Sequence, residues 1–436
     1  MQDGVDVRMI CTSIEITPSS TPRTRYNMYR IGVDVGGTNT DCAILDLKQL
    51  SSPSRGVLVS SKTPTTIDIT SGIISAVQDV LLKSNVPKES VLSVTIGTTH
   101  FVNAVVEADA RRLSRVAVVR LCGPATRNIP PFSDYPVGLQ SIMQGPVYYL
   151  DGGLEIDGRE ITPLNEGQIR ETALDIKAKG ITKVALVGVF SPLDHAGLHE
   201  ERCREIMSQI APDIDIVCSH AIGGVGLLER ENATILNASI LAVAQKTVRG
   251  FNRAMKNLDL RCSLYLTQND GTLTGADEGA KLPIKTFASG PTNSMTGAAF
   301  LAGLDRQRDS SEAASQILVV DIGGTTTDIC DLLSSGFPRQ APNYVEVGGV
   351  RTAFSMPDVF SVGLGGGSIV RADEAGNVTV GPDSVGHFLT SKALVFGGDV
   401  MTSTDIVVAT GKEKIGDVDA VSGVVPKVVD GARRKI

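Results

Sequence analysis

The chain has 436 residues, of which 42% are hydrophobic and 20% are charged, and it carries a formal net charge of −7. This composition predicts a soluble α/β enzyme of two or three domains and excludes a disordered or fibrous chain. The negative charge argues against nucleic acid and against an anionic membrane surface as partners, so a small molecule is the expected ligand.

Residues 1–28 are predicted to be a disordered tail, because they are rich in Ser, Thr and Pro. They also lack the charged-then-apolar order of a signal peptide. No apolar stretch of the sequence approaches the roughly 18 residues that span a bilayer. We therefore expect no membrane span, and the cytoplasm is the expected compartment.

The first ordered element is predicted to be a β-hairpin. A strand over Tyr29–Val33 runs into the sequence Asp34–Asp41, which contains two glycines and two threonines, and a second strand follows over Cys42–Leu47. Glycines without Cβ let backbone N–H groups approach phosphate oxygens, and threonine hydroxyls add donors. An aspartate at the strand end can hold a hydrated Mg²⁺ ion.

The middle of the chain alternates helices and strands, which predicts βαβ units on a parallel sheet. The expected strands are 91–96, 115–120, 184–190, 213–218 and 263–267, and the expected helices are 66–82, 165–179, 197–210 and 227–258. The Pro- and Gly-rich stretch 122–145 is predicted to be a loop. The chain is divided into domains 29–215 and 216–436.

A second copy of the glycine turn lies far downstream, at Asp321–Asp328, after a strand over Ile317–Val320. Two turns with the same order of acid, Gly, Gly, Thr and acid predict a nucleotide phosphate held between two halves. Neither turn matches the Walker-type pattern or the GxGxxG pattern, so a P-loop enzyme and a dinucleotide-dependent oxidoreductase are disfavoured.

Several polar groups are candidates for the substrate side. Gly97–His100 lies where a strand meets a helix, so its hydroxyls could receive an anion or a carbonyl, although Thr98 or Thr99 could simply cap the helix. Glu229–Asn232 is usually interpreted as a solvated helix face, whereas Asn232 could instead point at a substrate.

Two histidines, His195 and His199, have the spacing of metal ligands on one helical face. Pro192 and Gly197 interrupt a helix there, and no third ligand is near in sequence, so a structural or capping role is favoured. A third glycine turn, Gly365–Ser368, is predicted to form a separate loop that faces the cleft between the two halves.

Together these motifs resemble the hydantoinase/5-oxoprolinase family, specifically its hydantoin-utilisation A-type subunits, over residues 29 to 436. The resemblance rests on Ile31–Asp41, Ile96–Asn103, Leu227–Ala238, Ala288–Thr292, Asp321–Asp328 and Gly365–Ser368. It implies an α/β fold of the actin-like ATPase (ribonuclease H-like) type, with two lobes of mixed sheets flanked by helices and a nucleotide cleft between them.

The resemblance also implies ATP and Mg²⁺ as cofactors, and phosphorylation of a cyclic amide at its carbonyl oxygen before water opens the ring. The expected catalytic acids are Asp34, Asp41, Asp321 and Asp328, with Mg²⁺ at Asp34 and Asp321. The expected phosphate-binding residues are Gly36, Gly37, Thr38, Asn39, Thr40, Gly323, Gly324, Thr325, Thr326 and Thr327. The expected substrate-side residues are Thr98, Thr99, Asn103, Asn232, Ser289, Gly366 and Ser368.

A companion B-type subunit or associated domain and an oligomer are expected as partners, with no nucleic acid or membrane. Relative to the family pattern, the chain is expected to stop before the segment that packs the adenosine, which would weaken its affinity for ATP. Two alternatives remain: a non-catalytic nucleotide-binding subunit that needs a companion chain, and a small-molecule kinase that releases a phosphorylated product.

Overall fold

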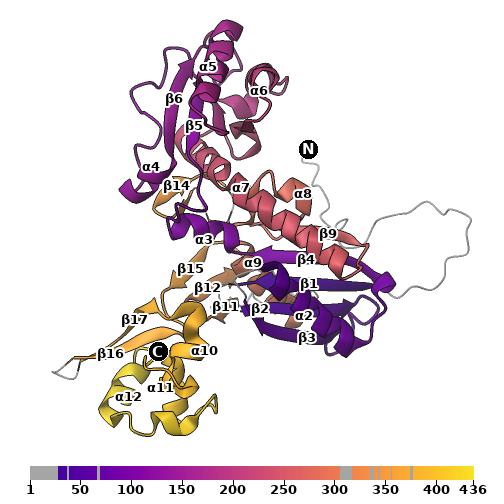
Figure 1. Cartoon of the computed structure of the whole chain (residues 1–436), viewed down its shortest axis with the longest axis vertical. Helices are drawn as coiled ribbons and strands as arrows, with labels where there is room; N and C mark the ends of the chain where they lie inside the picture. Colours follow the sequence, from indigo (N-terminus) through magenta and orange to yellow (C-terminus); the bar gives the residue numbers. More distant parts are fainter. Residues whose placement is uncertain are drawn as a thin grey trace, which may run out of the picture.

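The computed structural model describes residues 28–36, 39–65, 69–304, 317–333, 338–341, 344–354, 356–373 and 377–436. Figure 1 shows three groups of elements: a parallel sheet with α5 and α6, a larger sheet around β1, and a group that holds β11 and the C-terminus. The long helix α7 (Leu227–Asn257) runs from the first group to the second. No helix of the described residues is long and apolar enough to cross a bilayer.

The larger sheet has six strands and carries the first glycine turn. Its order is β10 (Leu273–Gly275), β9 (Ser263–Thr267), β4 (Val91–Thr98), β1 (Tyr29–Val35), β2 (Asn39–Asp46) and β3 (Val57–Pro64). β1 and β2 pair antiparallel, which confirms the predicted hairpin, and β1 and β4 pair parallel. The helix α2 (Ile69–Ser84) and the second half of α7 share one core with these strands. β9 and β10 lie beyond residue 215, so the sheet takes strands from both sides of the predicted domain boundary.

The parallel sheet confirms the predicted βαβ units. Its order is β6 (Gln144–Leu150), β5 (Val116–Leu121), β7 (Lys183–Gly188) and β8 (Asp215–Cys218), and all its pairs are parallel. The helices α5 (Glu166–Ala178) and α6 (Glu200–Ile210) pack on one face, and the first half of α7 packs on the other. β5 and β7 are buried along their whole length, as apolar strands covered on two faces must be.

The predicted loop over 122–145 is wrong in its second half. The helix α4 (Val137–Met143) forms there, and β6 begins at Gln144. Gly145 and Pro146 have the appearance of turn residues in the sequence. The structure accommodates them because β6 is at the edge of its sheet, where a strand tolerates a proline.

The third group is built on a sheet of β11 (Ile317–Ile322), β12 (Thr327–Leu332) and β15 (Val359–Val362). The hairpin of β16 (Ser368–Ala372) with β17 (Val378–Ser384) belongs to this group, whereas the hairpin of β13 (Val345–Val347) with β14 (Val350–Thr352) packs against α7 beside the parallel sheet. The remaining helices are α3 (His100–Val106), α8 (Ala276–Gly279), α9 (Ser289–Leu301), α10 (Leu389–Lys392), α11 (Ser403–Ala409) and α12 (Pro426–Arg433). The helix α9 contacts β4 of the six-stranded sheet as well as β11 and β12, so it bridges the two glycine turns.

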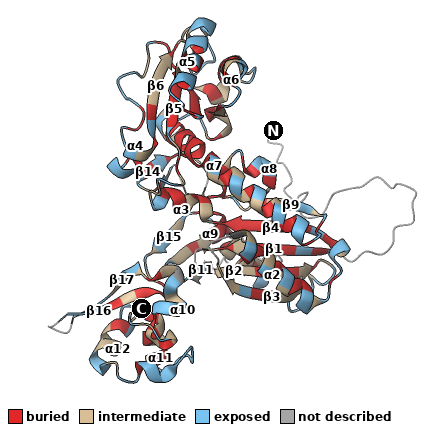
Figure 2. Cartoon of the chain, in the orientation of Figure 1, coloured by how far each residue is buried: buried red, intermediate tan, exposed pale blue. Residues whose placement is uncertain are grey.

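The charged start of α7 is not a solvated face, contrary to the usual interpretation of Glu229–Asn232. Figure 2 shows α7 buried where it meets the parallel sheet. The Arg120 guanidinium donates to both carboxylate oxygens of Glu231 at 2.8 and 2.6 Å. Arg230 donates to the carbonyl of Gly188 at 2.8 Å. These charges are inside because each has a partner there, which sequence periodicity alone does not reveal.

Candidate functional site

The two glycine turns have the same construction. In the first, the N–H of Gly36 donates to the carbonyl of Asn39 at 3.0 Å, and in the second, the N–H of Gly323 donates to the carbonyl of Thr326 at 2.8 Å. Asp34 and Asp41 face each other across the first hairpin, and Asp321 and Asp328 face each other across the second. The duplicated sequence therefore folds into duplicated geometry.

The charge of Asp321 acts on Asp34, which indicates that the second turn lies near the first. Burial raises the pKa of Asp34 to about 6, with further contributions from the carboxylates of Asp41 and Asp321. Burial, together with Asp321, likewise raises the pKa of Asp328, while a hydrogen bond from Ser361 opposes the shift. Acids that repel one another in this way mark a site that gains from a bound cation.

Two side chains near the first turn stabilise the ionised form of Asp34. The amide of Asn293, on α9, lies beside the carboxylate of Asp34 above Gly97 and lowers the pKa of Asp34, as a hydrogen-bond donor does. The Lys62 ammonium, on β3, lies 3.3 Å from a carboxylate oxygen of Asp41 and also lowers the pKa of Asp34. Sequence reasoning missed both residues. Asn293 directly follows the Ala288–Thr292 motif, which was the one available signal.

The second turn leaves donors available for a phosphate. Within the described part of the chain, the N–H groups of Gly324 and Thr325 donate to no backbone carbonyl, and the side chains of Thr325 and Thr326 form no hydrogen bond. Exposed N–H and hydroxyl groups in a tight turn suit an anion. In the first turn, Gly37 and Thr38 lie outside the described residues.

The last threonine of each turn has a bracing role. The Thr40 hydroxyl lies 3.2 Å from the Thr65 hydroxyl, which in turn donates to the carbonyl of Gly36 at 2.9 Å. The Thr327 hydroxyl donates to the carbonyl of Leu364 at 2.6 Å. These two predicted phosphate-binding residues therefore use their hydroxyls inside the protein, whereas the Asn39 side chain forms no hydrogen bond with the described residues.

The third glycine turn stacks directly on the second. The N–H groups of Gly366 and Gly367 donate to the carbonyls of Gly323 and Gly324 at 3.0 and 2.7 Å. Ser368, expected on the substrate side, is fully buried and accepts from the N–H of Gly365 at 2.9 Å. The third turn supports the second glycine turn and is not a separate loop, because two backbone hydrogen bonds join them.

The expected substrate side joins β4 to α9. The Ser289 hydroxyl lies 3.2 Å from both the N–H and the carbonyl of Thr98. The Thr98 hydroxyl accepts from the N–H of His100 at 3.1 Å, so the helix-capping alternative holds for Thr98. Thr99 is the N-cap residue of α3 but forms no side-chain capping bond, and it packs against Gly290. Asn103 keeps an amide that forms no hydrogen bond to any described residue.

Asn232 uses its amide within the fold. The side-chain nitrogen donates to Asp134 at 2.8 Å and to the carbonyl of Arg351 at 2.9 Å, and the backbone carbonyl of Asn232 accepts from the Tyr135 hydroxyl at 3.0 Å. These bonds hold α7 against β14. The structure therefore does not join Asn232 to the Thr98 and Ser289 group, and only its position in a motif supports a substrate role.

The segment with two histidines is structural. Asp194 accepts from the N–H groups of Leu198 and His199 at 3.0 and 2.8 Å, and His199 is buried with Nδ1 accepting from Gly153 at 3.1 Å. His195 is exposed. Nearby, Glu200, Cys218 and His220 bring possible metal-binding atoms together. Glu200 already accepts from the hydroxyls of two serines and from His220, as a carboxylate with a purely structural role does.

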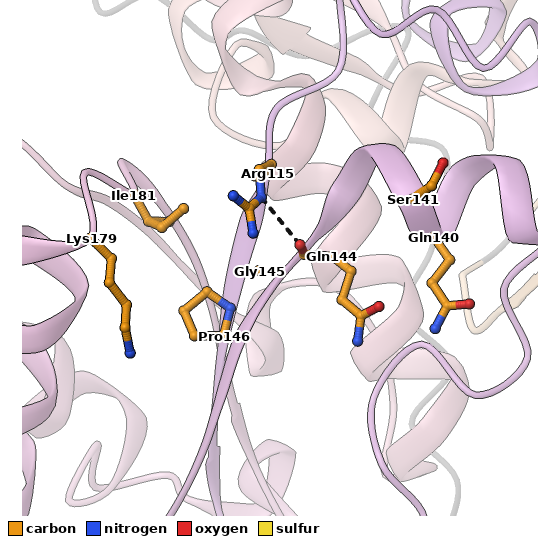
Figure 3. A pocket seen from close by; sticks show the side chains of 8 residues that line it. All are labelled: Arg115, Gln140, Ser141, Gln144, Gly145, Pro146, Lys179 and Ile181. Carbon is orange, nitrogen blue, oxygen red and sulfur yellow. Dashed lines mark hydrogen bonds between the residues drawn. The ribbon is translucent and has the colours of Figure 1, made fainter.

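A separate pocket of about 580 Å³ lies at the amino ends of β5 and β6 (Figure 3). It is lined by Arg115, Gln140, Ser141, Gln144, Gly145, Pro146, Lys179 and Ile181. Arg115 donates to the carbonyl of Gln144 at 3.3 Å, and Lys179 is paired with Asp175. Active sites on parallel sheets lie at the carboxyl ends of the strands, so this pocket is on the wrong edge for one.

The residues around Asp34 suit Mg²⁺. The neighbouring groups Asp41 and Asp321 offer carboxylate oxygens, which are hard ligands, and the raised pKa of Asp34 indicates unbalanced negative charge. Asp34 and Asp321 are the residues that would hold the ion, one from each turn.

Comparison with known proteins gives matches along most of the chain. Residues 30–211 match the hydantoinase/oxoprolinase N-terminal region, and residues 230–423 match hydantoinase/oxoprolinase. An uncharacterized protein of Methanocaldococcus jannaschii is 24% identical over 405 residues, which cover 88% of this chain and 57% of that protein. The caprolactamase subunit alpha of Pseudomonas jessenii is 24% identical over 405 residues, which cover 88% of this chain and 54% of the subunit.

Two solved structures share the fold. Nucleotide-free acetone carboxylase has a TM-score of 0.66 and 20% identity, covering 89% of this chain and 55% of that one. The ATP-dependent caprolactamase from Pseudomonas jessenii has a TM-score of 0.65 and 21% identity, covering 93% of this chain and 58% of that one. These likenesses confirm the predicted α/β fold with mixed sheets flanked by helices. The chain spans little more than half the length of the relatives that it matches.

Proposed function

The chain belongs to the hydantoinase/oxoprolinase family, and on that premise we propose that it uses ATP to open a cyclic amide of the hydantoin or 5-oxoproline type. The carrying observation is that two glycine turns of identical construction bring Asp34 and Asp321 close enough to repel each other. A pair of such turns suits a polyphosphate, because the two turns can hold the phosphate chain of a nucleotide from opposite sides.

In the proposed reaction, the ring carbonyl oxygen attacks the γ-phosphorus of ATP and ADP leaves. One water then adds to the activated carbon, and the C–N bond breaks with proton transfer to nitrogen, which leaves an acyl phosphate. A second water attacks the acyl carbon, and phosphate leaves with the former carbonyl oxygen. The net change is cyclic amide, ATP and two water molecules to amino acid, ADP and phosphate. Phosphorylation is needed because an amide is otherwise a poor electrophile.

The roles proposed for this chain are positioning and charge balance. Gly324, Thr325 and Thr326 offer N–H and hydroxyl donors to the phosphates, and Lys62 adds a positive charge beside Asp41. Asn103 offers its amide to the ring from the start of α3. A Mg²⁺ ion held by Asp34 and Asp321 would neutralise phosphate charge. Preorganised groups of this kind supply most of the rate enhancement in phosphoryl transfer.

A companion chain is part of this proposal. Two relatives are named as subunits, caprolactamase subunit alpha and the gamma subunit of the acetophenone carboxylase of Aromatoleum aromaticum. His100, one turn before Asn103 on α3, has its pKa lowered to about 4 by burial and by Arg112 and Lys246, which makes its imidazole a weak base. The group that activates water is therefore proposed to come from a B-type partner.

The test incubates the chain with ATP, Mg²⁺ and a panel of cyclic amides, with and without a B-type subunit. Mass spectrometry then measures ADP, phosphate and the ring-opened amino acid. The proposal predicts ADP and ring-opened product in equal amounts. A stable phosphoester would instead identify a small-molecule kinase, and nucleotide binding without turnover under any condition would identify a non-catalytic subunit.

A further inference from the structure

The helix α9 connects the two phosphate turns through contacts at both of its ends. Its first turn is fixed to the six-stranded sheet, because the Ser289 hydroxyl bonds the backbone of Thr98. Further along, Met295 and Ala299 are buried in one cluster with Cys330 and Leu332 of β12. Asn293 lies between these two anchors.

The contact between Asn293 and Asp34 depends on Gly97. A Cβ at Gly97 would lie 2.1 Å from the amide nitrogen of Asn293 and 2.8 Å from a carboxylate oxygen of Asp34. Both side chains therefore occupy the space above this glycine, and any larger residue there would separate them. The amide nitrogen and the carboxylate oxygen are therefore neighbours in this space, and the Asn293 amide lowers the pKa of Asp34.

We propose that Asn293 is a positioning residue, which holds the Asp34 carboxylate in the orientation that receives the metal ion and sets it relative to the second turn through α9. The proposal deepens the proposed function and rests on it for the role of Asp34. An amide suits this position because it restrains the carboxylate with a neutral donor, whereas a lysine would compete with the cation.

The test uses Asn293→Leu, which keeps the volume and removes the donor, and Gly97→Ala, which displaces the amide without removing it. Asn252→Leu is the matched control, because the Asn252 amide also donates to an aspartate, Asp277, at 3.2 Å, but on the surface. Binding of Mn²⁺ alone is measured by electron paramagnetic resonance. Each variant is compared in the natural background and in an Asp34→Asn background.

Asn293→Leu and Gly97→Ala are each expected to weaken Mn²⁺ binding about tenfold, as loss of a group that orients a metal ligand does. Asn252→Leu should stay within about twofold. In the Asp34→Asn background, both substitutions should lose their effect, because Asn293 acts through Asp34. With the cyclic amide, kcat should fall while KM stays within about twofold.

Equal losses in both backgrounds, unchanged Mn²⁺ affinity, or no Mn²⁺ binding by the unmodified chain would each overturn the proposal. A further result would also overturn it: Asn293→Leu loses Mn²⁺ binding together with a large fall in melting temperature, while Gly97→Ala keeps its Mn²⁺ affinity. If the Mn²⁺ results hold while no ring is opened, the proposed function fails and the positioning role stands.

Discussion

Asp34 is the residue at which the charges of both turns meet. Burial first, then Asp41 and Asp321, raise its pKa to about 6 from 3.8. The folded state therefore binds a proton here more tightly than the unfolded state does, so ionisation of Asp34 destabilises the fold. This penalty is absent below about pH 4, grows between about pH 4 and pH 6, and is complete above about pH 6.

Replacing Asp34 should therefore stabilise the metal-free protein at high pH only. In a chelator, Asp34→Asn is expected to raise the melting temperature by about 3 °C at pH 8 and to leave it unchanged at pH 4. Asp79→Asn is the control, because hydrogen bonds from Lys83 and Ser61 lower the pKa of Asp79. It should give no gain at pH 8, and an equal gain there would contradict the account.

Lys62 is expected to matter for activity more than for stability. Its ion pair with Asp41 is exposed, so Lys62→Met should change the melting temperature by less than about 2 °C. Its charge lies beside Asp41 of the first turn, where the proposed function places a phosphate, so kcat for ATP hydrolysis should fall about tenfold or more. Lys83→Met is the matched control, because Lys83 pairs with Asp79 at 2.6 Å on the far end of α2. Equal losses in both variants would refute a special role for Lys62.

Among the elements, α7 shows how buried charge fixes a helix. Arg120 and Glu231 are almost completely inaccessible. Glu231→Gln would leave the Arg120 guanidinium buried without a compensating charge, so the free energy of unfolding should fall by about 3–5 kcal/mol. Glu166→Gln breaks an exposed pair with Arg202 and should cost less than about 1 kcal/mol. Chemical denaturation measures both, and similar losses would contradict the argument.

A larger side chain in the third glycine turn should displace the backbone of the second turn. A Cβ at Gly365 would lie 2.6 Å from the carbonyl oxygen of Gly323 and 2.7 Å from the nitrogen of Thr325. Gly365→Ala is therefore expected to weaken nucleotide binding about tenfold, measured by calorimetry with ADP. Gly423→Ala is the control, because a Cβ there meets nothing within 4 Å. Unchanged affinity in Gly365→Ala would show that the third turn does not support the second.

The elements that the sequence predicted well are those with regular periodicity. The helix α7 and the strands β5 and β7 follow from runs of apolar residues, and the first hairpin follows from its glycine turn. β6 could not be predicted, because its Gly145 and Pro146 have the pattern of a turn. The contact between Asn293 and Asp34 could not be predicted either, because segments far apart in the sequence form it and no local pattern encodes their meeting.

At the scale of the whole molecule, the duplicated turn explains why the site lies between groups of elements. One copy closes β1 and β2, the other closes β11 and β12, and α9 contacts both sheets (Figure 1). A site assembled from two separated turns can change geometry when its ligand binds, since each turn has its own sheet. Phosphate groups bridging the turns would oppose the repulsion between Asp34 and Asp321.

The central claim is that the ring carbonyl oxygen becomes phosphorylated, and one isotope experiment tests it directly. A cyclic amide substrate labelled with ¹⁸O at the ring carbonyl is opened in unlabelled water with ATP and Mg²⁺, together with the B-type partner. The account predicts one ¹⁸O atom in the released phosphate for each ring opened, detected by mass spectrometry. Label that remains entirely in the new carboxylate, with unlabelled phosphate, would contradict it.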